Sequence, residues 1–338
     1  MRILITGNKG QLGTSIEKLM QEKSFTDVSF VDLPDFDLTN ETCVKDCIFS
    51  FKPELIINCS AYTAVDKAEE ERDMAEKVNS IGVKYIGKYS SQINAKVIHI
   101  STDYVFEGKG KDPTPSPSPQ GRGEEVLSLI CEEHQATSLA MESSLPLPCG
   151  EGTGVGSIAL FPDDNTNPQS IYGKTKLDGE INLITENKNS IIIRTSWLYS
   201  PFGNNFVKTM LKLGRQKEFI NVVYDQIGTP TYAIDLAAVI VTIAEKTELD
   251  KSFFVSGIYH YSNEGVCSWY DFAVMIFKTA NIPCRVNPIL TKDYPTAAKR
   301  PAFSVLDKSK IKKQFGIEIP HWIESLEKCL EKLETPIN

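Results

Sequence analysis

Short apolar runs alternate with amphipathic stretches along the first 100 residues of the chain. Helical periodicity is present at residues 11–22 and 42–51, and the four apolar runs around these helices are expected to form strands, at 2–6, 28–31, 55–58 and 95–100. Strands that alternate with helices build a parallel sheet that is covered on both faces. The pattern therefore predicts an α/β fold with a Rossmann-type, doubly wound parallel sheet.

The alternation returns near residue 171 and then changes. A helix is expected around the segment YGKTK, one buried strand at 191–199, and three further helices at 205–213, 232–245 and 269–280. Short strands and proline-containing loops separate these later helices. We therefore expect a dinucleotide-binding domain over residues 1–200 and a smaller, mainly substrate-binding C-terminal lobe over residues 201–338. The helix near 232–245 is a candidate for returning to the first domain.

Residues 109–157 interrupt this order with segments rich in proline, glycine and serine, TPSPSPQGRGE and SLPLPCGEGTGVG. A loop of this length without its own secondary structure is uncommon inside a compact domain unless it is functional or disordered. We expect a disordered insertion at 113–158. A substrate lid is the alternative.

The charge balance excludes several classes of partner. With 44 acidic and 36 basic residues, the 338-residue chain has a formal net charge of −8, which gives no cationic field for nucleic acid or an anionic membrane surface. No window reaches the ~18 apolar residues of a membrane span, and glycine interrupts the N-terminal segment too soon for a signal peptide. The eight cysteines include no CxxC pair and are expected to be reduced thiols. These features predict a cytoplasmic protein that binds neither nucleic acid nor membrane.

Three glycines with the spacing GxxGxxG directly follow the first predicted strand. Gly7, Gly10 and Gly13 allow the backbone to approach a pyrophosphate, which free N–H groups at a helix N-terminus can bind. Asp32 ends the second strand, where an acid can accept hydrogen bonds from the adenosine ribose. That acid favours NADH, whereas Lys9 could pair with the 2′-phosphate of NADPH. The pattern predicts one of these two cofactors, and a solvated acid with an ordinary surface lysine is the alternative.

A tyrosine and a lysine in the later helix form a candidate catalytic pair. Tyr172 and Lys176 are four residues apart, so their side chains share one helix face. Thr102 follows the strand at 95–100, at the sheet edge where ligands of parallel sheets bind. A neighbouring ammonium favours the phenolate form of a tyrosine, which titrates near pH 10 when free. This arrangement predicts ketone reduction in which Tyr172 protonates the developing alkoxide and Thr102 hydrogen-bonds the same oxygen. A core tyrosine beside a surface lysine is the alternative.

Eight longer segments carry a resemblance to a known family. They are GNKGQLG at 7–13, CSAYTAVDKAE at 59–69, HISTDYVFEG at 99–108, NPQSIYGKTKLDGE at 167–180, IIRTSWLY at 192–199, GNNFVKTML at 203–211, DQIGTPT at 225–231 and YPTAAKRPAFSVLD at 294–307. In these segments the chain resembles the extended short-chain dehydrogenase/reductase family and, within it, the dTDP-4-dehydrorhamnose reductases. The resemblance spans the chain apart from roughly 113–158.

The resemblance implies roles for the residues that match these segments. For the cofactor it implies Gly10, Gln11 and Leu12 at the pyrophosphate, Asp32, Asp37 and Leu38 at the adenosine half, and Ala61, Tyr62 and Thr63 at the middle. For the reaction it implies Tyr172 and Lys176 as the catalytic pair. For the substrate it implies Thr102 and Asp103 at the sugar, Trp197 as a pocket wall and Arg300 at the nucleotide end, where a guanidinium can pair with phosphate.

The resemblance also implies an activity. We expect reduction of the C4 ketone of dTDP-4-dehydro-6-deoxy-L-mannose to dTDP-L-rhamnose by NADPH or NADH, in nucleotide-sugar and cell-surface polysaccharide biosynthesis. The alternatives are another nucleotide-sugar reductase or epimerase, and a non-catalytic NADP-binding regulatory subunit of methionine adenosyltransferase. The family includes magnesium-associated dimers, so a homodimer is possible. Glu69 and Glu70 are more typical of a solvated helix face than of metal ligands, and we expect no metal.

Overall fold

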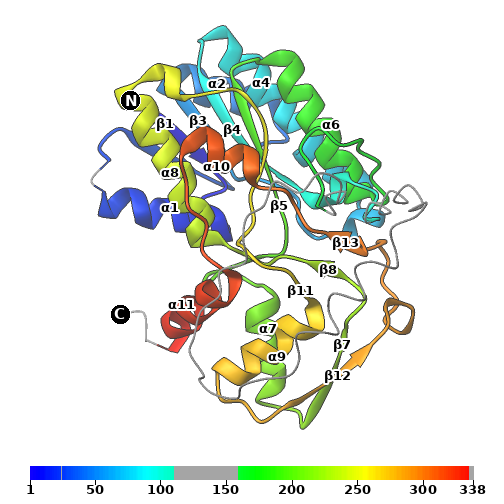
Figure 1. The fold of residues 1–338 in the computed structure, drawn as a ribbon. Helices are drawn as coiled ribbons and strands as arrows, with labels where there is room; N and C mark the ends of the chain where they lie inside the picture. The colour runs from blue at the N-terminus through cyan, green and yellow to red at the C-terminus, as the bar shows by residue number, and fades with distance from the viewer. Residues whose placement is uncertain (24, 110–158, 335–338) are drawn as a thin grey trace, which may run out of the picture. The chain divides into compact units, whose positions relative to one another are not determined.

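Six parallel strands form the central sheet of this computed structural model, which describes residues 1–23, 25–109 and 159–334 (Figure 1). Neighbouring strands follow the order β10, β5, β4, β3, β1, β2. Their bounds are β1 Ile3–Thr6, β2 Val28–Val31, β3 Leu55–Asn58, β4 Lys96–Thr102, β5 Ser190–Thr195 and β10 Gly257–His260. Every pair in this sheet is parallel. The predicted Rossmann-type sheet is confirmed.

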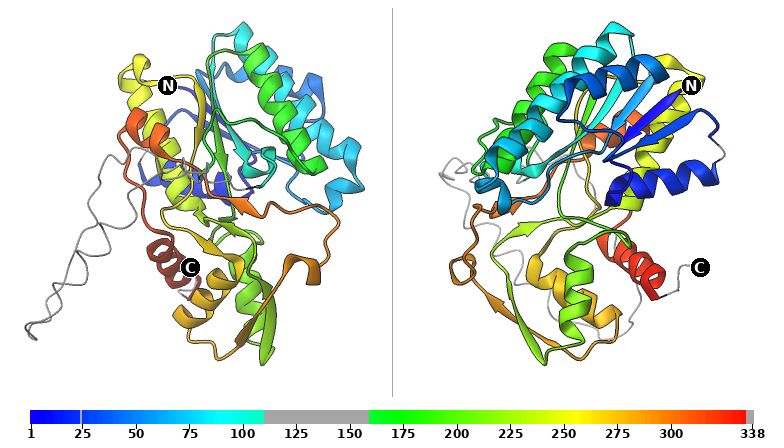
Figure 2. Two further views of the ribbon diagram at one scale, coloured as in Figure 1. Left: turned by 45° about the vertical axis from the view of Figure 1, so that its right-hand side comes forward. Right: turned by 180° about the vertical axis from the view of Figure 1, so that it is seen from behind.

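Apolar side chains leave the two faces of the sheet alternately, because successive residues of a strand point in opposite directions. In β1, Ile3 and Ile5 join one buried cluster and Leu4 joins another. Helices α1 (Gln11–Glu22), α8 (Ala233–Leu249) and α10 (Ser309–Phe315) cover the first face, and α2 (Glu41–Phe51), α4 (Gly82–Gln92) and α6 (Ile171–Glu186) cover the second. Figure 2 shows α4 and α6 lying side by side. The sheet is therefore buried on both faces.

A third apolar cluster belongs to the later part of the chain. It gathers α7 (Phe206–Gly214), α9 (Trp269–Thr279) and α11 (Trp322–Glu334) beside the paired strands β7 (Phe219–Val223) and β12 (Arg285–Ile289). Three short strands form a small sheet, β8 Ile227–Gly228, β11 Cys267–Ser268 and β13 Phe303–Ser304. After residue 201 the chain returns to the central sheet with α8 and β10. The division at residue 200 stays a prediction.

The predicted insertion at 113–158, and its alternative as a lid, lie outside the described residues. Within the described part, no helix combines the length and apolar character needed to cross a bilayer.

The strand expected at 191–199 is two strands, so this prediction was wrong. β5 ends at Thr195, and β6 (Leu198–Tyr199) pairs with β9 (Thr231–Tyr232) instead of joining the central sheet. The break falls at Trp197, whose φ of 49° lies in the left-handed region. The Ser196 hydroxyl donates to Thr229 O at 2.8 Å and holds the turned backbone. The apolar residues on both sides of this turn therefore did not reveal where the backbone bends.

Helix α6 approaches its neighbours very closely at two glycines. A Cβ on Gly173 would lie 2.2 Å from Tyr104 O, and a Cβ on Gly179 would lie 2.0 Å from Asn79 O. Asn79 belongs to the π-helical segment η2 (Lys77–Ile81), and Tyr104 to the 3₁₀ turn η3 (Asp103–Val105). Both opposing atoms are backbone atoms, so a side chain cannot be accommodated by rotation. The two glycines allow α6 to pack this closely.

We expect Gly179→Ala to lower the free energy of unfolding by about 1–3 kcal/mol or more, because overpacking forces the backbone of α6 or η2 to shift. Lys174→Ala, at an exposed position of the same helix, is the matched control and should change stability by less than about 0.5 kcal/mol. Urea unfolding followed by circular dichroism measures both. Equal stability of the two variants would show that the close contact does not constrain α6.

Candidate active site

Three polar side chains follow one another at four-residue spacing along one face of α6 and meet the end of β4. The Tyr172 phenol lies beside the Thr102 hydroxyl, and the Lys176 ammonium donates to Ile100 O at 2.6 Å. One turn further, Glu180 accepts a hydrogen bond from Ser101. The structure thus brings Tyr172, Lys176 and Thr102 together, and it adds Glu180, which was not predicted.

Burial controls the electrostatics of this pair. Lys176 is 2% exposed, and loss of solvation lowers the pKa of its ammonium to about 8, while Glu180 acts in the opposite direction. Burial also raises the pKa of the Tyr172 phenol, an effect that the neighbouring Thr102 hydroxyl partly offsets. At neutral pH the site therefore holds a protonated phenol beside a buried cation that gives up its proton more easily than an exposed lysine.

A buried ion pair anchors this face of α6 to the sheet. The Arg194 guanidinium on β5 donates to Glu180 through Nη2 at 2.7 Å and through Nε at 3.0 Å, and its Nη1 donates to Pro162 O. A second carboxylate binds the first residue of α6: Glu69 accepts a hydrogen bond from Ile171 N at 2.9 Å. The Glu69 carboxylate thus stabilises the N-terminus of α6, where a negative charge is favourable.

The glycine loop after β1 has the shape that a dinucleotide needs. Gly7 has a φ of 71°, and a Cβ on Gly13 would lie 2.2 Å from Gly7 O, so α1 can start this close to the strand only without side chains there. Gly10 precedes α1, whose first turn has neither a capping side chain nor an acidic residue. Its N–H groups therefore fit an anionic group such as a pyrophosphate.

Two predicted pyrophosphate residues turn their side chains away from this loop. Leu12 is buried in the core, and the Gln11 amide oxygen accepts from Ser200 and Asn205. Leu12 can therefore offer only its backbone N–H group to a pyrophosphate, and the oxygen of Gln11 is already occupied. Their roles stay predictions.

Asp32 lies at the end of β2, beside the glycine loop. Its carboxylate accepts from the backbone N–H of Lys9 at 3.0 Å and of Leu33 at 2.7 Å. The Lys9 ammonium donates to Leu33 O. These bonds place an acid and a cation on the same rim, so the local geometry is compatible with either NADH or NADPH.

The other predicted adenosine and mid-cofactor residues are held by local bonds. Asp37 accepts from both the N–H and the hydroxyl of Thr39, and Leu38 is buried. Ala61 and Thr63 flank Tyr62, whose backbone N–H and C=O are both bound by the Asn79 side chain, at 2.8 and 3.1 Å. Asn79 also donates to Thr175 on α6. Asn79 thus ties the expected cofactor loop to the catalytic helix, and no sequence signal marked it.

A cavity of about 650 Å³ lies beside the catalytic pair and contains two predicted substrate residues, Trp197 and Arg300. Trp197 stacks on Trp269 with ring centroids 3.7 Å apart. The Arg300 guanidinium donates to the Tyr104 hydroxyl at 3.2 Å and forms an ion pair with Asp66. Further polar lining comes from Lys217, Asn221 and Gln226. The cavity therefore combines aromatic walls with cationic and amide groups.

Tyr104 connects this cavity to the catalytic pair. Its ring lines the cavity and meets the Tyr172 ring edge to face, with centroids 5.4 Å apart. Thr102 and Asp103 do not line the cavity. Sequence reasoning missed Tyr104 and Asp66, although both fall inside segments that carry the resemblance.

Asp103 is a buried acid at the end of β4. It is 3% exposed, and one carboxyl oxygen accepts from the Thr102 hydroxyl at 2.9 Å. The other oxygen has no hydrogen-bond partner among the described residues. Burial raises the pKa of this carboxyl to about 6. Its predicted contact with the sugar stays a prediction.

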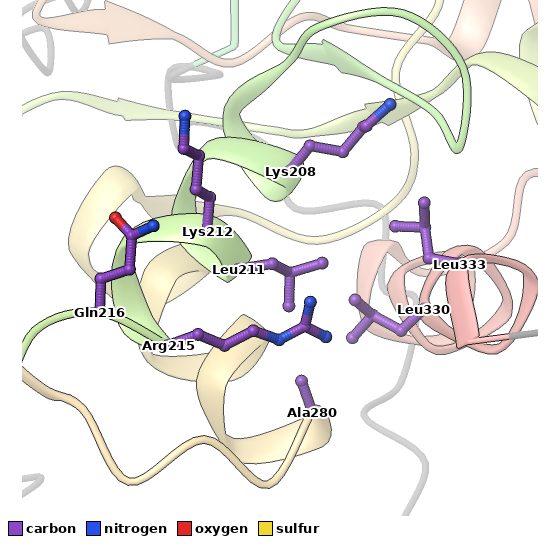
Figure 3. A pocket seen from close by; sticks show the side chains of 8 residues that line it. All are labelled: Lys208, Leu211, Lys212, Arg215, Gln216, Ala280, Leu330 and Leu333. Carbon is purple, nitrogen blue, oxygen red and sulfur yellow. The ribbon is translucent and has the colours of Figure 1, made fainter.

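A second, smaller cavity of about 310 Å³ is separate from this site (Figure 3). Lys208 and Lys212 of α7, and Arg215 directly after this helix, surround an apolar floor formed by Leu211, Ala280, Leu330 and Leu333. None of the predicted site residues lines it. A metal centre is likewise not found among the described residues, where no three His, Cys, Asp or Glu side chains gather.

Comparisons with known proteins agree with this geometry. The family described as "RmlD substrate binding domain" matches residues 1–123 and 152–335. A dTDP-4-dehydrorhamnose reductase from Aggregatibacter actinomycetemcomitans is 40% identical over 332 residues, which cover 96% of this chain and 97% of that protein. The crystal structure of a dTDP-4-dehydrorhamnose reductase from Clostridium acetobutylicum superposes with a TM-score of 0.80 at 37% identity, covering 99% of this chain and 100% of that one. That of the Bacillus anthracis reductase in complex with NADP has a TM-score of 0.79 at 34% identity, with 98% and 99% covered.

We expect Asp103→Asn to stabilise the protein increasingly as the pH rises. A carboxyl whose pKa is raised by folding binds its proton more tightly in the folded state, so stability falls as pH rises from its unfolded pKa of about 4 to its folded pKa of about 6. Relative to the parent, the free energy of unfolding of the variant should gain about 2 kcal/mol between about pH 4.5 and 7.5. Urea unfolding across this range measures it. A difference that does not change with pH would contradict the buried, ionising Asp103.

Proposed function

The chain belongs to the RmlD family of dTDP-4-dehydrorhamnose reductases, and from that membership we propose that it reduces a dTDP-linked 4-keto-6-deoxyhexose at C4 to dTDP-L-rhamnose. NADPH or NADH is the reductant. The observation that carries the proposal is the placement of Tyr172 and Lys176 on one face of α6, with the phenol against Thr102 and beside the large cavity.

The two alternative functions differ in what they require of this pair. A regulatory subunit that only binds NADP needs neither a buried ammonium nor a phenol at the end of β4, and holding both there is costly because burial disfavours the charged lysine. The geometry therefore favours catalysis. An epimerase would use the same pair, so only the product distinguishes it from a reductase.

The described residues can hold the cofactor at three places. The loop from Gly7 to Gly13 and the start of α1 bind the pyrophosphate, Asp32 accepts from the adenosine ribose, and the loop around Tyr62 lies against the middle of the molecule. When bound, NADPH or NADH supplies the hydride for the carbonyl carbon.

Tyr172 supplies the proton. Its phenol, whose pKa is raised by the loss of solvation, is protonated at neutral pH, so it can donate to the ketone oxygen as that oxygen becomes an alkoxide. The Thr102 hydroxyl, which donates to Asp103 in this structure, can turn its single hydrogen toward the same oxygen and stabilise it. The Lys176 ammonium then stabilises the phenolate that remains, and because it is 2% exposed its charge is little screened by water.

The cavity holds the rest of the substrate. Arg300 and Lys217 supply positive charge for a diphosphate, and the stacked Trp197 and Trp269 offer a flat apolar surface. Binding at these remote groups orients the C4 carbonyl toward Tyr172. Binding energy used for orientation raises turnover as well as affinity.

Purified protein with NADPH should reduce the dTDP-linked keto sugar to dTDP-L-rhamnose, with the product identified by chromatography. The UDP-linked and GDP-linked sugars should react more slowly. The free sugar should lose kcat as well as affinity, because remote binding no longer orients the ketone. Preference for the GDP-linked sugar, or epimerisation without net oxidation of the cofactor, would defeat the proposal.

Tyr172→Phe should retain cofactor binding and lose about 10²- to 10⁴-fold in kcat, because only the proton donor is removed. Tyr259→Phe is the matched control. The Tyr259 hydroxyl also donates a hydrogen bond within the protein, to Val255 O at 2.9 Å. Tyr259 lies on β10 and not on the catalytic helix. Fluorescence titration of NADPH and initial rates test both variants, and turnover of Tyr172→Phe within a few-fold of the control would remove Tyr172 as the acid.

We further propose that the enzyme acts in the cytoplasm and assembles as a homodimer. The location is supported by six cysteines that are free thiols in the described part of the chain. The homodimer rests on the family resemblance. Cell fractionation and light scattering of the purified protein test these two points.

A further inference from the structure

A row of buried polar side chains crosses the central sheet beneath the catalytic pair. Thr6 on β1 is in register with Asn58 on β3, and Asn58 is in register with His99 on β4. The Thr6 hydroxyl donates to Asn58 Oδ1 at 2.7 Å, Asn58 Nδ2 lies 2.9 Å from His99 Nδ1, and His99 Nε2 lies 3.4 Å from Lys176 Nζ. None of the four is more than 2% exposed. The row therefore ends on the catalytic lysine and is shielded from bulk solvent.

One backbone group decides how this row is protonated. Ser60 N–H donates to Asn58 Oδ1 at 3.1 Å, and a backbone N–H cannot accept. If the amide of Asn58 were turned over, its NH₂ group would face this donor. The oxygen of Asn58 therefore faces Ser60, and its NH₂ group faces His99.

The orientation of Asn58 then fixes the state of His99. An NH₂ group can only donate, so Nδ1 accepts, and the proton of the neutral imidazole lies on Nε2. An imidazolium would place a second N–H against Asn58 and a positive charge beside Lys176. Burial and the Lys176 charge both lower the pKa of His99 well below its usual value, in agreement with a neutral ring.

The Nε2–H bond of His99 thus points at the Lys176 nitrogen. An ammonium has three donors and no acceptor, so it cannot take this hydrogen bond, whereas a neutral amine has a lone pair that can. We propose that His99 is a positioning residue for Lys176 that, as the Nε2–H tautomer set by Ser60 and Asn58, favours the neutral amine over the ammonium. Its catalytic consequence rests on the proposed reductase function, but the tautomer does not.

The other groups around Lys176 do not compete for this role. Ile100 O accepts from its nitrogen, and the Glu180 carboxylate is already bonded to Arg194 and Ser101. Cys59, after β3, has a pKa raised to about 12 by burial and stays a neutral thiol. Tyr172 lies one turn earlier on α6 and is also neutral, because burial raises its pKa. His99 is the neighbour that presents an N–H to the lysine.

Nitrogen-15 NMR of the histidine-labelled protein reads the tautomer directly and needs no substrate. We expect a His99 signal pair typical of Nε2–H, unchanged from about pH 6 to pH 9. His99→Gln identifies the signal among the four histidines. An Nδ1–H tautomer or an imidazolium in this range would overturn the proposal.

Three variants test the effect on catalysis. Asn58→Asp keeps the shape but accepts from His99 Nδ1, so Nε2 becomes an acceptor for the ammonium. His99→Gln can place a carbonyl oxygen at the Nε2 position without adding charge. In both, the alkaline fall in kcat should move upward by about one pH unit, because the ammonium is stabilised. Thr6→Val is the control, since it removes a hydroxyl from the same row and leaves Ser60 to orient Asn58, and its profile should match that of the parent.

The outcomes separate the possible explanations. A shift in Asn58→Asp but not in His99→Gln would assign the effect to added charge and overturn the proposal, and so would a shift in Thr6→Val. If a variant fails to fold, as judged by circular dichroism, the parent tautomer still decides. If the parent reduces no nucleotide sugar, the function fails, while the NMR result stands on its own.

Discussion

The position of helix α6 depends on the absence of side chains at Gly173 and Gly179, where the helix meets backbone oxygens of its neighbours. At this distance, residues spaced by one turn reach the end of β4 in succession. Tyr172 reaches Thr102, Lys176 reaches Ile100 O, and Glu180 reaches Ser101. A helix displaced by the width of a methyl group would lose all three contacts together. The close packing is thus the condition on which the site chemistry depends.

The same packing excludes water, and this makes each buried polar group depend on its partners. Glu180 and Arg194 are each 3% exposed or less at their side chains, and a charge left alone there would be strongly destabilising. Asn79 and Asn58 satisfy buried neutral polar groups, since each hydrogen-bonds backbone or side-chain groups of two different elements. The site is therefore held by polar residues outside the catalytic pair, and their substitution would disturb loops and charges at a distance.

The parts of the fold and site that were predictable are those encoded by local patterns. The sheet, the glycine loop and the spacing of Tyr172 and Lys176 depend on residues that are neighbours in the chain. The ion pair of Asp66 with Arg300 joins residues 234 positions apart, and no local pattern shows such a contact. The helical stretch that begins with α3 (Arg72–Glu76) was missed because its first turns are mostly charged and exposed. The turn at Trp197 was missed because apolar residues resume directly at it, so the segment was taken as one strand.

Strand β10 completes the sheet from a part of the chain that is synthesised late. It pairs with β5, yet roughly 60 residues separate the two strands, and the core on the same face also needs Ile311 and Phe315. At about 5–20 residues per second, a ribosome needs several seconds to make the intervening segment. If the first five strands pair during that interval, β5 forms an open edge of the sheet, the kind of surface that recruits other strands. The late position of β10 in the chain therefore favours folding in which a chaperone covers this edge, or in which pairing waits until β10 has left the ribosome.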